Sequence, residues 1–164
     1  MLINFKEVIS ENELKEVEAL ATIIWRQHYT PIIGEDQVTY MLEKFQSVET
    51  MRGQIGQGYH YFLINDEDVS LGYLSYEKRL KKLFLSKIYV LQNYRGKGIG
   101  TLGMKFVMDT AKTLGCTVVS LTVNKYNHNS IKAYEKLGFI NKKGLVQDIG
   151  GGFVMDDYLM EIRL

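Results

Sequence analysis

The stretch that decides the fold is VLQNYRGKGIGT, Val90–Thr101. It joins an apolar run that predicts a strand to a longer segment in which apolar residues recur at helical spacing. Glycine occupies every second position from Gly96 to Gly100, so backbone N–H groups can face one small volume without Cβ atoms in the way. The helix that follows adds unpaired N–H groups and the positive end of its dipole. Together with the cations Arg95 and Lys97, this arrangement suits a pyrophosphate.

Other interpretations of the same glycines fit less well. A P-loop needs Ser or Thr directly after its Gly-Lys pair, whereas Gly98 follows Lys97 here. The dinucleotide pattern G-x-G-x-x-G is met by residues 98–103, but it needs an acidic residue about 20 positions further on. No Asp or Glu lies between Gly115 and Tyr134. A turn that only reverses the chain would not need two cations at the start of a helix.

Outward from this stretch, the periodicity of the apolar residues predicts an α/β protein with a mixed sheet and helices on both faces. The predicted strands cover residues 2–9, 59–64, 69–77, 83–90, 117–123, 139–149 and 153–164. The first predicted helix opens at a capping box over residues 10–13, and the second follows Gly34. Two further helices are predicted over residues 98–114 and 127–137. Residues 26–31, which contain the only proline, are predicted as the connection between the first two helices. The order is β-αα-βββ-α-β-α-ββ.

Composition and charge narrow the class of protein. The chain has 164 residues, which fits a single domain over residues 1–164 with its own core. Its 20 Lys and Arg balance 19 Asp and Glu, and the net charge of +1 disfavours a nucleic-acid partner. The single cysteine, Cys116, excludes an internal disulfide, and no Cys/His cluster has the spacing of a metal site. Without a signal pattern or an apolar run of about 20 residues, we expect a cytoplasmic protein with no membrane partner.

Two motifs together resemble one family. Arg95–Gly100 resembles the R/Q-x-x-G-x-G/A acyl-CoA pyrophosphate loop of the GNAT superfamily of N-acetyltransferases. Asn127–Phe139 resembles the family segment N-x-x-A-x-x-x-Y-x-K-x-G-F, with Ser130 in place of the usual alanine. The element order is similar to the family over essentially the whole chain. One departure is Gln92, where members often carry proline.

The resemblance implies that acetyl-CoA is the cosubstrate and that an amine attacks its thioester directly in a ternary complex. The strands over residues 83–90 and 117–123 would splay apart, and pantetheine would pair with the backbone of Ile88, Tyr89 and Val90. The Val90 N–H would donate to the developing oxyanion. The implied contacts to the CoA phosphates are Arg95, Gly96, Lys97, Gly98, Ile99, Gly100 and Thr101.

Three residues of the second motif have a functional and a structural interpretation. Tyr134 is expected to protonate the leaving thiolate, although its helical spacing from Ile131 and Leu137 also suits a core aromatic. Asn127 would meet the cofactor with its side chain, cap the helix, or do both. Lys136 would reach a CoA phosphate, or it is an ordinary exposed lysine in the last turn of a helix.

The general base is not evident from the sequence. Many family members carry a Glu on the strand before the pyrophosphate loop. Here that strand, residues 83–90, offers Ser86 and Lys87 and no carboxylate. Glu77 on the preceding strand, His28, or a chain of water molecules are the alternatives. The missing carboxylate keeps open a second interpretation, in which the chain is a catalytically silent acyl-CoA sensor of the same fold.

An aromatic and polar segment near residues 25–33 suits the lining of an acceptor cleft, and it resembles the bacterial diamine/polyamine acetyltransferase branch in length and position. The expected acceptor is a small-molecule or peptide amine, and Asp156 and Asp157 could attract a cationic one or simply be solvated. The residues predicted to line the acceptor site are Trp25, His28, Tyr29, Tyr40 and Glu77. Dimers are common in the family, so a homodimer is compatible with the sequence, which leaves the oligomeric state open.

Overall fold

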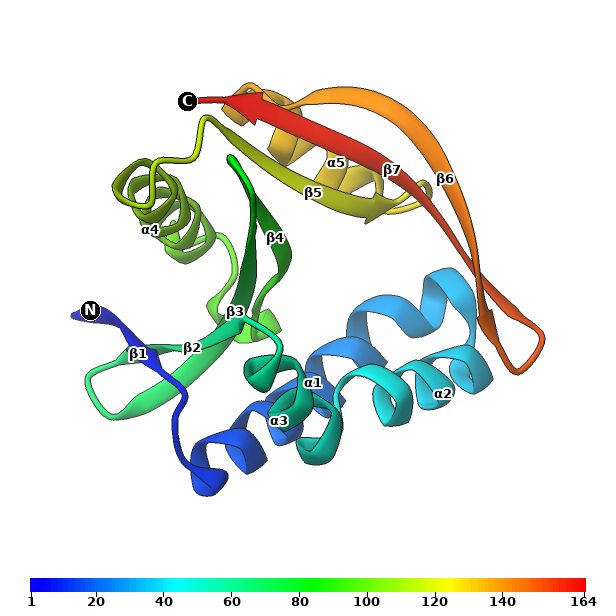
Figure 1. The fold of residues 1–164 in the computed structure, drawn as a ribbon. Coiled ribbons are helices and arrows are strands. Elements are labelled where there is room, and N and C mark those ends of the chain that lie inside the picture. The colour runs from blue at the N-terminus through cyan, green and yellow to red at the C-terminus, as the bar shows by residue number, and fades with distance from the viewer. The chain divides into compact units, whose positions relative to one another are not determined.

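The structure, a computed structural model, describes all residues from Met1 to Leu164 (Figure 1). Its seven strands have the order β1-β2-β3-β4-β5-β7-β6. The strands are β1 (Ile3–Glu7), β2 (Tyr59–Asp66), β3 (Val69–Arg79), β4 (Lys82–Val90), β5 (Val118–Asn124), β6 (Ile140–Gly150) and β7 (Phe153–Arg163). The helices are α1 (Glu11–Ile33), α2 (Glu35–Phe45), α3 (Val48–Gly56), α4 (Ile99–Thr113) and α5 (His128–Leu137). Because β4 and β5 pair in parallel while β2–β3 and β5–β7 are antiparallel, the predicted mixed sheet is confirmed.

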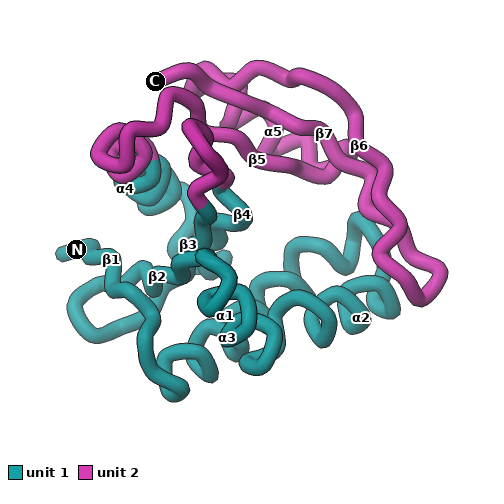
Figure 2. Tube along the Cα trace, in the orientation of Figure 1, with its two compact units in different colours: residues 1–77, 85–107 teal, residues 78–84, 108–164 magenta.

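The chain forms two compact units (Figure 2). Unit 1 comprises residues 1–77 and 85–107, and unit 2 comprises residues 78–84 and 108–164. The single domain over residues 1–164 stays a prediction.

The predicted capping box opens α1. The Ser10 side chain accepts a hydrogen bond from the Glu13 backbone N–H, and the Glu13 carboxylate accepts from the N–H groups of Ile9 and Ser10 at 3.0 and 2.9 Å. Lys6 pairs with the second carboxylate oxygen at 3.1 Å. These contacts lower the pKa of Glu13 to about 2, and the hydrogen bond from Ile9 contributes most. Burial acts in the opposite direction but is outweighed.

Two predictions about the helices are wrong. Residues 26–31 are not a connection, because α1 continues to Ile33 with Pro31 in its last turn and is followed by Gly34, whose φ is 88°. Contacts of Trp25 and Tyr29 with Tyr89 hold these turns against the sheet and outweigh the helix-breaking tendency of proline. A third helix, α3, was not expected because Met51 is its only buried residue, which leaves little apolar periodicity to detect. The order is therefore β-ααα-βββ-α-β-α-ββ.

Unit 1 places a helix on each face of its strands. Successive side chains of β4 point to opposite faces, and Tyr89 meets Trp25 of α1 while Ile88 meets α4 at Gly103. On the α4 face, Phe106 stacks on Phe5 with ring centroids 4.5 Å apart. The two helices thus bury both surfaces of β4 immediately before the glycine-rich loop.

Gly72 permits a close approach between β3 and β4. A Cβ atom at this position would overlap the carbonyl oxygen of Tyr89. The same junction is closed by a hydrogen bond from the Leu91 N–H to the Leu71 carbonyl at 2.8 Å. The backbone of β4 therefore has a fixed path where the strand ends.

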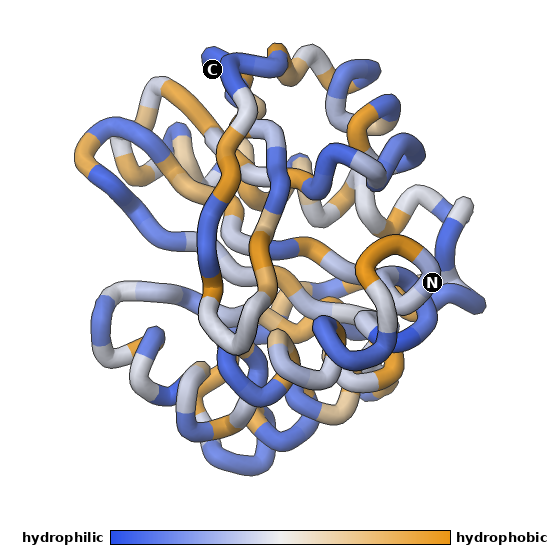
Figure 3. Tube along the Cα trace, turned by 90° about the vertical axis from the view of Figure 1, so that its right-hand side faces the viewer, coloured by the Kyte–Doolittle hydropathy of each residue, from blue (hydrophilic) through white to orange (hydrophobic).

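Unit 2 is built around the antiparallel strands β5, β7 and β6. Met160 pairs with Leu121 and is fully buried, and Cys116 is a buried core residue with a free thiol. The hairpin β6–β7 alternates between hydrophobic and hydrophilic stretches along its length (Figure 3). α5 ends at Leu137, as predicted, and Gly138 after it adopts the left-handed conformation. No helix in the structure combines the length and the apolar character that crossing a membrane requires.

Candidate active site

The glycine-rich loop links β4 to α4 through a short 3-10 turn over Gln92–Tyr94. Gly96 and Gly98 adopt φ values of +76° and +79°, a region in which side chains are strained. The space above Gly96, Gly98 and Gly100 is open, because no atom lies within 4 Å of a Cβ placed there. The first hydrogen bond of α4 runs from the Leu102 N–H to the Gly98 carbonyl, so the preceding N–H groups are available to a ligand.

Two exposed cations flank this loop. Arg95 donates from Nε to the Val90 carbonyl at 3.1 Å, which fixes the loop to the end of β4. Lys97 holds its ammonium 5.5 Å from the centroid of the Tyr94 ring. Ile99 is 2% exposed and anchors the start of α4, while Thr101 is exposed. An open glycine cradle, unpaired N–H groups and two cations fit the diphosphate of a nucleotide cofactor such as CoA.

The end of β4 holds the three residues predicted to pair with pantetheine. Ile88 faces α4, Tyr89 faces α1, and Val90 is buried at the last position of the strand. These contacts fix the side chains in the core. The predicted backbone roles of Ile88, Tyr89 and Val90 stay predictions.

Three of the predicted acceptor residues gather around Tyr89. The Tyr29 and Tyr89 hydroxyl groups are 2.8 Å apart, and His28 lies edge-on to Tyr29 with ring centroids separated by 4.7 Å. Trp25 lies edge-on to both tyrosines at 5.7 and 5.8 Å. Trp25 is only 4% exposed and donates from its indole to the Tyr73 hydroxyl at 3.1 Å. Its place is therefore behind Tyr29 and Tyr89, which it supports from the core.

The other two predicted acceptor residues lie on different elements of unit 1. Tyr40 is on α2, where the Lys44 ammonium is 3.5 Å from its hydroxyl oxygen. Glu77 is half-buried near the end of β3, opposite Tyr59 of β2.

The sequence did not reveal a polar network beneath the first three helices. Lys87 of β4 donates to the Tyr61 hydroxyl at 3.0 Å, and Tyr61 donates to Gln54 of α3 at 2.5 Å. Beside it, Tyr73 donates to Gln46 at 2.7 Å. Burial lowers the pKa of Lys87 to about 7 and raises that of Tyr61 to about 12. A lysine within an otherwise apolar strand was the available signal.

The second motif lies in unit 2. Tyr134 is half-buried, with its ring centroid 5.7 Å from that of Phe139, and Lys136 is exposed. Asn127 occupies the N-cap position of α5 and is 4% exposed, yet its side chain makes no capping hydrogen bond. The capping interpretation of its side chain is therefore wrong. Its contact with a cofactor stays a prediction, as do the roles of Tyr134 and Lys136.

Two adjacent carboxylates on β7 differ in environment. Asp156 pairs with Lys125 at 2.7 Å. Asp157 is 7% exposed, and burial, assisted by the charge of Asp156, raises its pKa to about 6. Asp157 is therefore not simply solvated.

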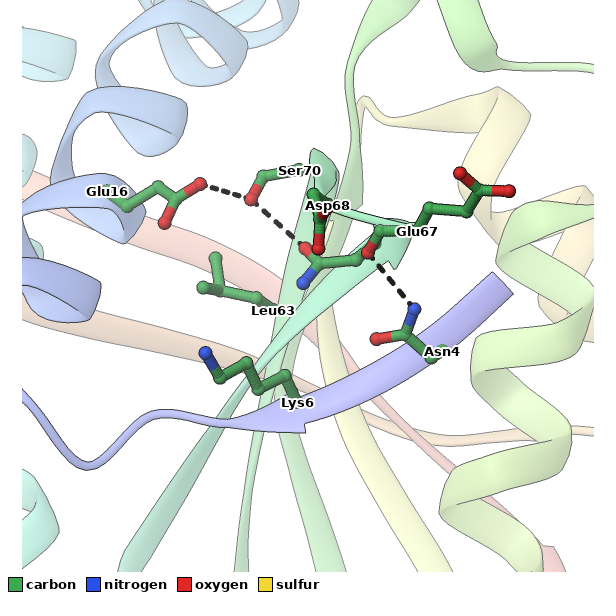
Figure 4. Close-up of a pocket in the computed structure, with 8 residues that line it drawn as sticks. Asn4, Lys6, Glu16, Leu63, Glu67, Asp68 and Ser70 are labelled. Atoms are coloured by element: carbon green, nitrogen blue, oxygen red, sulfur yellow. Dashed lines mark hydrogen bonds between the residues drawn. The ribbon is translucent and has the colours of Figure 1, made fainter. Parts of the chain in front are cut away.

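A separate hollow of about 430 Å³ lies at the β2–β3 turn (Figure 4). The Ser70 hydroxyl bridges Glu16 and Asn65, and Asn4 donates to the Glu67 carbonyl at 3.3 Å. These polar groups satisfy one another. None of the predicted site residues lines this hollow.

Comparison with known proteins gives consistent matches. The model of the family described as "Acetyltransferase (GNAT) family" matches residues 17–139. The mouse "Thialysine N-epsilon-acetyltransferase" is 33% identical over 84 residues, which cover 51% of this chain and 43% of the mouse protein. The chain thus matches less than half the length of this curated relative.

Two solved structures share the fold. The PaiA N-acetyltransferase of Thermoplasma acidophilum in complex with coenzyme A has a TM-score of 0.83 at 21% identity, with full coverage of both chains. The spermidine N-acetyltransferase of Vibrio cholerae in complex with CoA and spermine has a TM-score of 0.72 at 16% identity, covering 98% of this chain and 95% of that one.

Proposed function

Because the chain belongs to the acetyltransferase (GNAT) family, we propose that it transfers the acetyl group of acetyl-CoA to a primary amine by direct attack in a ternary complex. The observation that carries this proposal is the loop Arg95–Thr101, an open glycine cradle at the start of α4 flanked by two cations. The N–H groups of Ile99 and Gly100 would bind the diphosphate of the cosubstrate, with Arg95 and Lys97 neutralising its charge.

Bound acetyl-CoA would supply the thioester whose acetyl group is transferred. The backbone of Ile88, Tyr89 and Val90 would hold the pantetheine arm, and the Val90 N–H would stabilise the oxyanion by donating a hydrogen bond from a fixed position. Tyr134 would donate a proton to the leaving thiolate. A tyrosine with an ordinary pKa near ~10 is a weak acid toward a thiolate near ~8.5, so this transfer would be concerted with bond breaking.

The acceptor that we propose is a small cationic amine of the polyamine type, or a peptide amine. The hydroxyl oxygens of Tyr29 and Tyr89 would accept hydrogen bonds from an ammonium, and the faces of aromatic rings attract a cation and its alkyl chain. Tyr40 and Glu77 complete the proposed acceptor residues. Two relatives named above, one for thialysine and one for spermidine, act on amines by name, which supports this class.

One observation favours a second candidate function, an acyl-CoA sensor without catalysis. β4 carries no carboxylate in the segment before the pyrophosphate loop, so the proton of an ammonium acceptor has no acidic side chain to receive it there. The presence of Tyr134 favours the enzyme instead.

The test is release of free thiol from acetyl-CoA across a panel of polyamines, amino acids, aminoglycosides and N-terminal peptides. Saturable thiol release with at least one amine, with acetylation of that amine confirmed by mass spectrometry, is the expected result. Saturable binding of acetyl-CoA with no release on any acceptor would favour the sensor. Absence of binding would refute both functions.

A further inference from the structure

Lys87 occupies an unusual position for a lysine. It lies within β4, half-buried, with its ammonium 3.0 Å from the Tyr61 hydroxyl oxygen and 5.3 Å from the centroid of that ring. No carboxylate pairs with it, unlike Lys6, Lys82 and Lys125, which each hold an ion pair. A buried cation without a counter-ion favours the neutral amine, and burial alone lowers the pKa of Lys87 to about 7.

The hydrogen bonds around Tyr61 decide what a neutral Lys87 can do. The Tyr61 hydroxyl directs its only proton to the Gln54 side-chain oxygen at 2.5 Å. Tyr61 can therefore only accept from Lys87, which must donate one of its own N–H groups. The lone pair of a neutral Lys87 is not consumed by this contact and stays available for a proton.

Lys87 lies on the face of β4 where the proposed acceptor residues gather. Side chains two residues apart in a strand share a face, so Lys87 and Tyr89 point the same way. Tyr89 contacts Tyr29 and Trp25 on that face. Val90, the proposed oxyanion donor, follows three residues after Lys87 on the same strand.

The hydroxyl groups and amides that surround Lys87 on this face do not compete with it as a base. Burial raises the pKa of both Tyr61 and Tyr73, so these hydroxyl groups stay neutral. The helices α2 and α3 contribute amides, Gln46 and Gln54, which do not titrate. On this face the strands and α1 also carry the titratable groups Tyr59, Glu77, Tyr89, His28 and Tyr29. Among these, Glu77 is the one carboxylate.

Resting on the proposed function, we propose that Lys87 is the general base, whose neutral amine takes a proton from the ammonium of the acceptor. The acceptor nitrogen then uses its free electron pair to form the N–C bond while the C–S bond breaks. The nitrogen then loses its second proton to water, the thiolate takes the proton of Tyr134, and Tyr134 regains a proton from water. Lys87 returns its own proton to water. Tyr61 is a positioning residue, because it holds the Lys87 nitrogen without taking its lone pair.

The experiment compares Lys87→Arg and Lys87→Met with the wild-type chain, using an amine found in the thiol-release panel. Arginine keeps the charge but cannot give up its proton, so it separates a base from a fixed cation. For both variants we expect kcat to fall about 100-fold or more, the size of a general-base contribution. The KM for acetyl-CoA is expected to stay within about threefold, because this lysine would not bind the cosubstrate.

The pH profile supplies a readout that a structural role would not move. The wild-type kcat is expected to rise through an apparent pKa of about 7, and that limb is expected to disappear in Lys87→Arg. Tyr61→Phe removes an acceptor that favours the ammonium form, so its acidic limb is expected at lower pH. Lys81→Met, in the exposed turn before β4, is the matched control and should retain the full wild-type profile.

Nuclear magnetic resonance titration of the lysine side chains in the wild-type chain tests the protonation of Lys87 directly, without relying on the activity of a variant. The Lys87 signal, assigned as the one absent from Lys87→Arg, is expected to titrate near pH 7. Titration near the ordinary value of ~10.4, or wild-type kcat and pH profile in Lys87→Arg, would overturn the proposal. If the wild-type chain binds acetyl-CoA but acetylates no amine, the proposed function itself fails, and Lys87 has no base role.

Discussion

Replacing Gly98 with alanine tests whether the loop after β4 is a phosphate cradle or only a turn. Gly98 has a φ of +79°, and an alanine in the left-handed region costs about 1–2 kcal/mol. No atom lies within 4 Å of the new Cβ, so the strain is the whole cost in the free protein. Gly115→Ala is the matched control, because Gly115 has a φ of +77° and equally open space but lies outside this loop.

The backbone strain of an alanine at Gly98 can appear as a lower melting temperature or as a weaker affinity for acetyl-CoA. If the loop keeps its path, the melting temperature falls by about 2–4 °C for each kcal/mol in a chain of this size. If the loop relaxes in the free protein, the same energy is lost when acetyl-CoA binds, which weakens the affinity by about 5- to 30-fold. The two losses, measured by thermal unfolding and by calorimetric titration, should together amount to about 1–2 kcal/mol.

Gly115→Ala should carry the same backbone strain, so its melting temperature should fall by about 2–4 °C for each kcal/mol. Gly115 is not among the residues proposed to bind the cosubstrate, so the affinity for acetyl-CoA should stay within roughly threefold, about 0.7 kcal/mol. The reasoning would be refuted if Gly98→Ala weakened neither the fold nor the binding of acetyl-CoA, because the left-handed backbone at Gly98 would then carry no cost.

Three further expectations concern single side chains. Tyr134→Phe should lower kcat with little change in the affinity for acetyl-CoA, and full turnover of this variant at every pH would remove Tyr134 as the acid. Glu13→Gln should lower the free energy of unfolding, measured with urea at pH 7, by about 1–2 kcal/mol. The pKa difference alone implies ~3 kcal/mol, but solvent screens a site so near the surface. Because folding lowers this pKa from 4.5 to about 2, the cost should shrink as the pH falls through that window, and a cost independent of pH would contradict it. Asp157→Asn should stabilise the fold at pH 8 by on the order of 1–2 kcal/mol and should not do so at pH 4. Folding raises the pKa of Asp157 from 3.8 to about 6, so the wild-type chain loses stability as the pH rises through that range. Equal melting curves of variant and wild type at pH 8 would speak against a buried charge.

The sequence predicted most strands and helices because their apolar residues recur at clear periods. It failed where tertiary contacts or weak burial decided the outcome. The last turns of α1 form despite Pro31, because Trp25 and Tyr29 pack on Tyr89, a residue sixty positions away from Tyr29. α3 buries only Met51, so its period could not be distinguished from that of a polar loop.

The candidate site was predictable only in its local parts. The loop Arg95–Thr101 is contiguous, so its glycines and cations could be interpreted directly from their order. The contact between Lys87 and Tyr61 joins β4 to β2, and its partner Gln54 comes from α3. The periodicity of apolar residues predicts single elements but does not predict which three of them meet in space. The depth of Trp25 was equally hidden, because an aromatic residue suits a cleft wall and a core alike.

The place of Trp25 has a practical consequence, since it is the only tryptophan in the chain. Its indole is shielded from water, hydrogen-bonded to Tyr73, and edge-on to Tyr29 and Tyr89. Its ultraviolet fluorescence therefore comes from a single position at the junction of α1 and the end of β4. A ligand that shifts Tyr89 will change the intensity or wavelength of this emission. The protein thus contains an intrinsic optical probe with which the proposed binding of a cosubstrate and an amine can be tested without labels or thiol reagents.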